Sequence, residues 1–261
     1  IMKIAFWSPV HGQTCTTSNM IAVATVAVLQ YNIKALLVQT HFCLNNLERS
    51  LIGYQRDPDS LIDIGIDELA RSPKLANLDK ETIYNCSINA LKNLHLLPGT
   101  LRHREDYERS TAPKLNRIVT SAEKFYDIIF IDTNAGNSQT SMDMLHAADL
   151  IVVNLSQNIF VIDKYFEDYN FDPDKTFYLI GDYEKDSKYN LFNLKSKYEF
   201  FNNKNIGVIP HCVFYKDAQS SENALRFIRS NIDCNKGPNA YFIKAIKEAS
   251  EMILDKVKKG V

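Results

Sequence analysis

The sequence predicts an α/β fold built on an open, mostly parallel sheet that is flanked by helices on both faces. Short apolar runs of strand length alternate with segments of helical periodicity along most of the chain. The run at 128–131 contains only large apolar residues, which is typical of a strand buried on both faces. The spacing of these runs leaves room for helices between strands, which favours parallel pairing through right-handed crossovers.

The composition is that of a globular chain. With 261 residues, 45% of them hydrophobic, it can bury one sizeable core, so we expect a single domain over residues 2–261, with Ile1 as a cloning remnant. The formal net charge of −1 gives no reason to expect a nucleic-acid partner. The sequence has no apolar run near the ~18 residues of a membrane span and no leader pattern. Its five scattered cysteines are typical of reduced thiols, so we expect a cytoplasmic protein.

The first βα unit is the strongest candidate for a functional site. Residues 3–7 are a predicted strand, 8–13 a loop, and a helix begins between 14 and 17. In this layout backbone amides and the positive end of a helix converge on a phosphate. The P-loop pattern G-x-x-x-x-G-K-[ST] is broken, because Trp7 stands at its first glycine and Gln13 at its lysine, so an ordinary βα unit is the alternative. The candidate phosphate-binding residues are His11, Gly12, Gln13, Thr14, Cys15 and Thr16.

The run SPVHGQTCTTSNMIA, residues 8–22, resembles the deviant P-loop of the ParA/MinD family of partitioning and positioning ATPases, KGGVGKTTxxxNLA. In this resemblance Ser8 falls at the signature lysine, Gln13 at the phosphate lysine, Thr14 at the magnesium-binding hydroxyl and Asn19 at the helix asparagine. The segment SPVHGQT, residues 8–14, resembles the P-loops of the TadZ/CpaE branch, which are atypical. Members of that branch mark the site of pilus assembly. The resemblance implies ATP and Mg2+ as cofactors.

The second predicted strand, at 34–40, also departs from the family pattern. The family ends this strand in D-x-D, whereas this chain has Gln39 and His41 at the two acidic positions. The second aspartate helps to organise the attacking water in the family, so its replacement by His41 implies weak hydrolysis. His41 as a catalytic base is one interpretation and a polar loop residue is the other.

The predicted strand at 126–133 ends in Asp132, and parallel strands present such carboxylates at the edge of the sheet where ligands bind. The family pattern for this segment is YDxxxxDTPPG. This chain has the aspartate, Asp132, and the glycine, Gly136, but neither proline. Asp132 would then hold Mg2+ opposite Thr14. An exposed aspartate that ends a strand is the alternative.

The remaining segments complete the alternation. Helices are predicted at 60–70, ended by Pro73, and at 115–124 and 141–148; strands are predicted at 149–155, 175–181 and 205–210; and a short apolar run lies at 88–98. The charged stretch 101–109 is a solvated loop or a helix start, with a docking surface as the alternative. A helix is also expected to start near 215.

Two later segments carry open questions. Residues 182–205 interleave aromatic and charged side chains, and we expect an amphipathic helix over the sheet, with stacking on single-stranded nucleic acid as the alternative. The resemblance puts Asp182 and His211 where relatives approach the adenine base. Residues 240–257 form a helix with one apolar face, which we expect to pack against the sheet rather than bind a membrane.

The lost lysine decides the predicted function. Removing one such preorganised donor from a developing charge costs about 3 kcal/mol, whereas the backbone cradle and the metal remain for binding. We therefore expect an ATP-binding switch that forms a homodimer, hydrolyses ATP weakly or not at all, and recruits a protein partner of a membrane-associated pilus or secretion machine. No catalytic residue is assigned. One alternative is a pseudo-ATPase scaffold. Another is an active partition ATPase that binds DNA through Arg226, Arg229, Lys236, Lys244 and Lys247.

Overall fold

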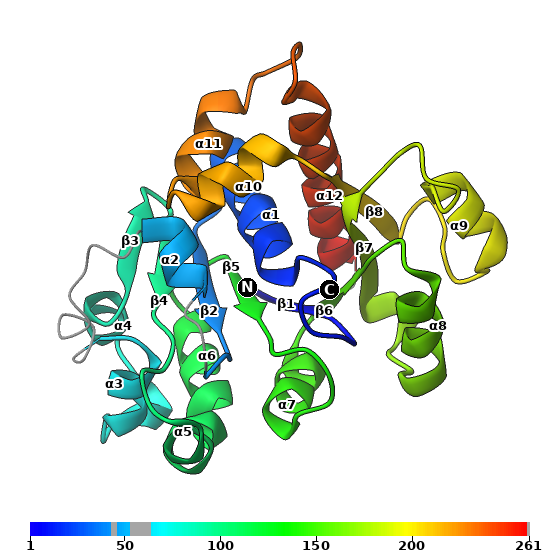
Figure 1. Cartoon of the computed structure of the whole chain (residues 1–261). Helices are drawn as coiled ribbons and strands as arrows, with labels where there is room; N and C mark the ends of the chain where they lie inside the picture. Colours follow the sequence, from blue (N-terminus) through cyan, green and yellow to red (C-terminus); the bar gives the residue numbers. More distant parts are fainter. Residues whose placement is uncertain (43–45, 53–63, 260–261) are drawn as a thin grey trace.

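The computed structural model describes residues 1–42, 46–52 and 64–259, and these form one eight-stranded sheet (Figure 1). The strand order is β3-β4-β2-β5-β1-β6-β7-β8. Every neighbouring pair is parallel except β3 and β4, which are antiparallel. The predicted fold class is therefore confirmed. The strands are β1 (Met2–Trp7), β2 (Ala35–Gln39), β3 (Ile88–Leu91), β4 (Leu94–Leu97), β5 (Ile128–Asp132), β6 (Leu150–Leu155), β7 (Thr176–Tyr183) and β8 (Ile206–Pro210).

Strand β1 lies inside the sheet, between β5 and β6. Its register sets Phe6 beside Asp132 of β5 and Trp7 beside Val153 of β6. The carboxyl ends of these strands therefore meet at one edge, where the loop after β1 faces the loop after β5. Gly136 of the latter donates its amide to the carbonyl of Ser8 at 3.0 Å, which joins the two loops.

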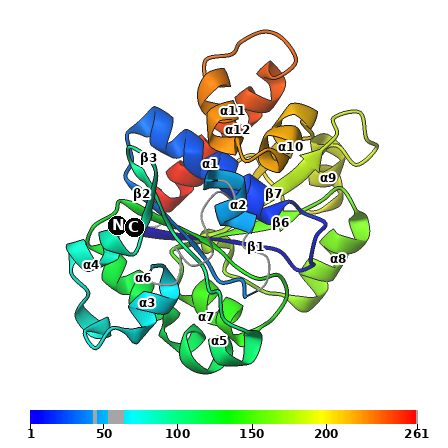
Figure 2. The ribbon, with the colours of Figure 1, turned by 60° about the vertical axis from the view of Figure 1, so that its left-hand side comes forward.

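The sheet has helices on both faces (Figure 2) and separates two apolar cores. Alternate side chains of β1 enter opposite cores, with Ile4 and Phe6 on one side and Ala5 and Trp7 on the other. The first face carries α1 (Thr16–Tyr31), α2 (Asn46–Ile52), α10 (Val213–Ser220), α11 (Ala224–Asn231) and α12 (Ala240–Lys259). The second carries α3 (Ile66–Arg71), α4 (Lys80–Asn85), α5 (Arg104–Ser110), α6 (Leu115–Glu123), α7 (Gln139–Ala147), α8 (Ile159–Asp168) and α9 (Leu191–Lys197).

Helix α1 is held between the sheet and other helices, and its residues 19–28 are all buried. Helix α12 packs on β8 and α1, and its apolar stripe is buried, as predicted for 240–257. That stripe consists of Phe242, Ile246, Ala249, Ile253 and Val257. Within the described ranges, no helix is both long and apolar enough to cross a bilayer.

Some predicted elements differ from the structure. The prediction of an amphipathic helix over 182–205 is wrong. Only Leu191–Lys197 is helical, and Phe192 of this helix is 81% exposed. The preceding backbone is held in another conformation by Gln157, which accepts from the amide of Glu184 and donates to the carbonyl of Tyr189. The apolar run at 88–98 forms the hairpin of β3 and β4, and the helix expected from 215 divides into α10 and α11. The predicted helix at 60–70 falls partly outside the described residues, and its remainder is α3.

Candidate functional site

A cavity of about 810 Å³ opens at the carboxyl edge of the sheet. Loops after β1, β2 and β5 supply most of its wall, and α2, α5 and α10 close the rim. Its lining consists of Val10, His11, Gly12, Thr14, Cys15, Thr16, Thr17, Ser18, His41, Phe42, Arg49, Ser50, Arg104, Thr133, Asn134, Ala135, Ser138, Gln219 and Ser220. The cavity thus gathers five of the six predicted phosphate-binding residues. The sixth, Gln13, is exposed and does not line it.

The β1–α1 loop turns the open end of α1 toward this cavity. Gly12 (φ 73°) and Cys15 (φ 55°) both have left-handed backbone conformations, which delay the start of the helix until Thr16. The first intrahelical bond is donated by Asn19 to the carbonyl of Cys15, so the amides of residues 16–18 have no partner within the helix. No side chain caps this end. The helix therefore presents unpaired donors and its positive pole to the cavity.

Cys15, at the start of α1, is not a reactive thiolate. Burial raises the pKa of its thiol, and the nearby charge of Asp182 raises it further. A neutral thiol at this position adds no negative charge to the cavity wall.

Asp132 lies beneath this helix end and is completely buried. Its Oδ2 atom accepts a hydrogen bond from the Thr17 hydroxyl at 2.6 Å and lies 3.3 Å from Nε2 of His41. Its Oδ1 atom is buried and has no hydrogen-bond partner. The alternative of an exposed aspartate is therefore wrong. Burial of a carboxylate oxygen without a hydrogen-bond partner costs free energy, and a bound cation would offset this cost.

The structure brings Thr17 to Asp132, whereas the sequence resemblance paired Thr14 with it. The Thr14 hydroxyl instead lies 3.1 Å from that of Thr16, and the backbone carbonyl of Thr14 accepts from the side-chain amide of Asn19 at 3.0 Å. The difference arises because the helix starts at Thr16, so that Thr17 falls in its first turn. Four of the residues 14–18 carry hydroxyl groups, and the sequence gave no signal to choose among them.

The loops after β1 and β5 are held in place by hydrogen bonds of asparagine amides and by the close packing of β7 against the β1–α1 turn. Asn19 also donates to Oδ1 of Asn154 at 2.9 Å, which ties α1 to β6. Gly181 of β7 lies against the same turn, because a Cβ there would come within 2.4 Å of the Thr14 carbonyl oxygen. On the other side of the cavity the amide of Asn134 donates to the Thr40 hydroxyl at 3.0 Å. The cavity floor is therefore fixed from several strands.

Basic side chains form part of the described lining of the cavity. Its described lining includes two arginines, Arg49 and Arg104, and two histidines, and no carboxylate. Burial lowers the pKa of His41, but its contacts with Asp132 raise it more, so the net shift is upward. The wall is thus suited to an anion.

Asp182 and His211, predicted to approach a base, lie next to each other but do not line the cavity within the described chain. His211 Nδ1 and Lys216 Nζ lie 2.8 and 2.9 Å from the same Asp182 oxygen. Burial raises the pKa of Asp182, but the hydrogen bonds from Lys216 and His211 lower it more. These groups satisfy one another, and their contact with a base stays a prediction.

The residues present fit Mg2+ bound together with phosphates. Among the described residues, no group of three or more histidine, cysteine, aspartate or glutamate side chains could form a metal site. Mg2+ commonly keeps several waters and takes only one or two carboxylates alongside substrate phosphates. Asp132, with its unpaired oxygen, is such a carboxylate.

Comparison with known proteins places this geometry in a known fold. No family model and no curated protein sequence matches the chain. A ParA family ATPase from Chlorobium tepidum TLS matches it with a TM-score of 0.75 at 13% identity, over 96% of this chain and 98% of that one. The fold is that of the ParA/MinD ATPases.

Two other proteins with the ParA/MinD fold were solved with nucleotides. MinD from Pyrococcus horikoshii OT3, complexed with Mg-ADP, matches with a TM-score of 0.68 at 16% identity, over 100% of this chain and 98% of that one. A putative plasmid partition protein from Borrelia burgdorferi B31, bound to AMPPNP, matches with a TM-score of 0.66 at 19% identity, over 100% of both chains. The ParA/MinD fold thus spans the whole length of this chain.

Proposed function

We propose that the cavity binds ATP with Mg2+ and that the protein is a nucleotide-dependent dimerising switch with weak or no hydrolysis. The observation that carries this proposal is the cavity at the open end of α1, beside a buried aspartate with one unpaired oxygen. Its volume of about 810 Å³ lies in the range of small-molecule sites. The nucleotides in the two structures compared above support the choice of ligand.

The metal would be held by Asp132 and by threonine hydroxyls of the β1–α1 turn. Thr17 already contacts Asp132, and the family resemblance adds Thr14. Bound Mg2+ supplies neutralisation of phosphate charge. The amides of residues 16–18 and of the Gly12 turn would bind the phosphate oxygens.

Weak hydrolysis follows from the side chains at the lysine positions. Ser8 is 1% exposed and its hydroxyl donates to the carbonyl of Val10, so it does not supply a charge. Gln13 is uncharged and exposed. His41 stands at the second acidic position of the family's D-x-D and lies 3.3 Å from Asp132. Loss of a preorganised charge slows such a step by about two to three decades.

Titration calorimetry with ATP, with and without Mg2+, tests the proposal. We expect binding that strengthens with Mg2+, and Asp132→Asn should lose that strengthening while retaining its fold by circular dichroism. No binding at millimolar nucleotide would reject the proposal in favour of the pseudo-ATPase scaffold. Phosphate release measured on the same samples should remain near background, and rapid turnover would contradict the weak-hydrolysis part.

Dimerisation and positioning form the second part of the proposal. Residues 8–14 resemble the TadZ/CpaE branch, which supports a positioning role at a pilus or secretion assembly. Light scattering after gel filtration should give a larger mass with ATP and Mg2+ than without them. The same mass in both conditions would contradict a switch.

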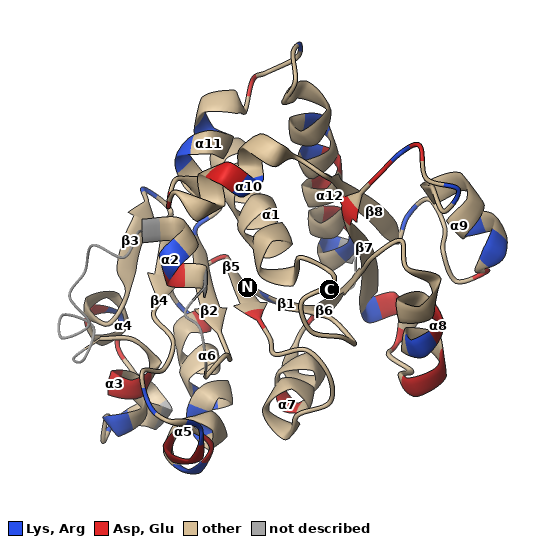
Figure 3. Cartoon of the chain, in the orientation of Figure 1, with Lys and Arg blue, Asp and Glu red and all other residues tan. Residues whose placement is uncertain are grey.

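The DNA-binding alternative has less support. Basic and acidic residues are interspersed on α12 (Figure 3), and Lys244 lies 3.7 Å from Glu248. DNA affinity that falls steeply with salt would favour this alternative.

A further inference from the structure

Trp7 stands at the first glycine of the P-loop pattern and is the only tryptophan of the chain. It ends β1, directly before the β1–α1 loop, and its side chain is completely buried in the core on the face of the sheet away from α1. The indole is not part of the described cavity lining. An effect of Trp7 on a bound ligand therefore has to pass through another residue.

Gly136 is the residue that connects Trp7 to the cavity. The indole Nε1 atom of Trp7 donates to the Gly136 carbonyl at 2.8 Å, and the Gly136 amide donates to the carbonyl of Ser8 at 3.0 Å. The backbone of Gly136 is left-handed (φ 79°), a conformation that glycine adopts without strain. Two hydrogen bonds of one residue thus fasten the β5–α7 loop to the start of the β1–α1 loop.

The β5–α7 loop, residues 133–138, forms part of the cavity wall. Its residues in the lining are Thr133, Asn134, Ala135 and Ser138. The first half of the loop is held by the sheet, because the amide of Thr133 donates to the carbonyl of Phe6 at 3.0 Å. The second half, residues 135–138, is joined to the β1–α1 loop through the two bonds of Gly136. The spacing of the two loops across the cavity therefore depends on these bonds.

The indole of Trp7 is held in its orientation by aromatic rings of α8 and of the segment after it. Its ring centre lies 4.6 Å from that of Tyr169 and 5.3 Å from that of Phe171, both edge-to-face. The ring centre of Tyr165 lies 6.3 Å away. Edge-to-face packing favours particular ring orientations. The indole N–H is thereby fixed toward Gly136.

We propose that Trp7 is a positioning residue for the nucleotide, which sets the spacing of the β1–α1 and β5–α7 loops through its hydrogen bond to Gly136. This inference rests on the proposed function and names a residue on which the site depends without touching the ligand. A ligand that contacts both loops binds well only when the loops are correctly spaced, because such contacts tolerate displacements of about 0.5 Å. Loss of the indole donor should therefore lower the affinity for Mg-ATP.

Replacement of the single tryptophan by benzothienylalanine tests this role, because the analogue keeps the shape of the ring and lacks the N–H donor. It is incorporated in a tryptophan auxotroph, and Trp7 is the one position that changes. Fluorotryptophan, which keeps the N–H, is introduced in the same way and is the matched control. Calorimetry should give an affinity for Mg-ATP about fivefold lower in the benzothienyl protein, whereas the control should stay within about twofold of the wild type.

The fluorine resonance of the control protein supplies a readout that simple burial of the ring would not move. It should shift when Mg-ATP saturates the protein, because the ligand contacts the loop to which the indole is bonded. A resonance that does not move on saturation would contradict the coupling between Trp7 and the cavity.

Trp7→Phe and Tyr165→Phe give a second comparison, made by ordinary mutagenesis. Tyr165→Phe removes a hydroxyl that is hydrogen-bonded to Tyr178 in the same aromatic cluster, and it leaves the Gly136 bond intact. Trp7→Phe should lower the affinity for Mg-ATP, whereas Tyr165→Phe should not, even where both lower the urea midpoint. Equal losses of affinity would assign the effect to aromatic packing and overturn the role of the indole N–H.

The same measurements separate this inference from the proposed function. If the benzothienyl protein binds Mg-ATP as the fluorinated control does, the inference is overturned while the proposed function stands. If the wild-type protein binds no ATP at millimolar concentration, the proposed function fails and the inference fails with it.

Discussion

The hydroxyl of Thr17 donates a 2.6 Å hydrogen bond to the buried carboxylate of Asp132, and this bond joins the first turn of α1 to the tip of β5. Thr17→Ala should lower the free energy of unfolding by about 1–2 kcal/mol, because a buried carboxylate loses a donor. It should also weaken Mg-ATP binding. Urea unfolding at pH 7 measures the first effect. Thr16→Ala is the control, and an equal loss in both variants would contradict a special role for Thr17.

Gly181 gives a steric prediction. A Cβ on this residue would lie 2.4 Å from the Thr14 carbonyl oxygen and 2.7 Å from Asn19 Nδ2. Gly181→Ala should therefore cost about 1–3 kcal/mol and displace the β1–α1 turn. In Gly207→Ala the new atom meets nothing nearer than Phe177 Cζ at 3.2 Å, so a smaller loss is expected. Thermal unfolding compares the stability losses of the two variants. A larger loss in Gly207→Ala would contradict the close contact of Gly181 with the β1–α1 turn.

His95 gives a pH dependence away from the cavity. It is 9% exposed, its Nδ1 lies 2.9 Å from the Tyr126 hydroxyl, and burial and the charge of Lys34 lower its pKa. A lowered pKa means that the unfolded chain binds the proton first, so the stability present above the unfolded value of about 6.5 is lost as the pH falls below it.

We therefore expect the wild type to lose more stability between pH 7.5 and pH 5.5, about one unit on each side of that value, than His95→Gln does. Urea titrations at these two pH values measure the difference. His146→Gln, which changes an exposed residue of α7, should follow the wild type. Equal losses of stability in His95→Gln and the wild type would contradict the assignment of this pH dependence to His95.

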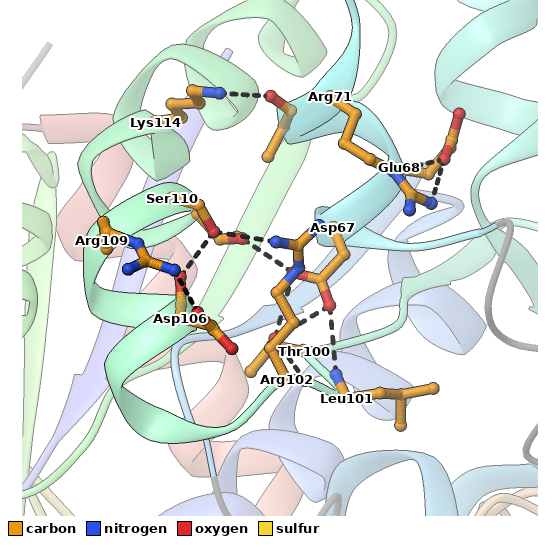
Figure 4. A network of polar contacts seen from close by, with 12 residues as sticks. Asp67, Glu68, Arg71, Thr100, Leu101, Arg102, Asp106, Arg109, Ser110 and Lys114 are labelled. Carbon is orange, nitrogen blue, oxygen red and sulfur yellow. Dashed lines mark hydrogen bonds and ion pairs between the residues drawn. The ribbon is translucent and has the colours of Figure 1, made fainter.

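Asp67 gives a prediction for the wall of the cavity. Its buried carboxylate accepts hydrogen bonds from the hydroxyls of Thr100, before α5 (Figure 4), and of Thr111, at the end of that helix. Asp67→Ala should therefore destabilise the protein by about 3 kcal/mol and weaken ATP binding by releasing α5. Glu68→Ala, on the same helix, removes only an exposed ion pair with Arg71 and should cost less than about 1 kcal/mol. Similar losses in the two variants would show that the Asp67 network does not hold α5.

The central part of the fold could be predicted because its signals are local. The apolar runs of β1, β5 and β6 are strands in their own right, and the repeated strand and helix lengths imply parallel pairing. The hairpin of β3 and β4 was missed because Lys92 and Asn93 turn the chain inside what reads as one apolar run. The helix expected over 182–205 failed because side-chain bonds from Gln157 overrode local periodicity.

The candidate site was predicted only in part. Asp132 and the loop could be found because they lie at strand ends. Thr17 was missed because its selection depends on the left-handed conformation of Cys15, which a residue other than glycine rarely adopts. Arg49 and Arg104 reach the cavity only through the tertiary position of α2 and α5, so sequence spacing gave no indication of either.

The inner position of β1 bears on how the chain folds during synthesis. Met2 pairs with Ile128 and Ile4 with Leu150, so β1 is synthesised well before both of its neighbours in the sheet. Long separations of this kind slow folding, and until they close, the nascent β1 remains an unpaired apolar edge. A truncated translation product that stops before residue 150 would lack β6 and part of the cavity wall. We expect chaperones to bind such a product because β1 would expose apolar side chains.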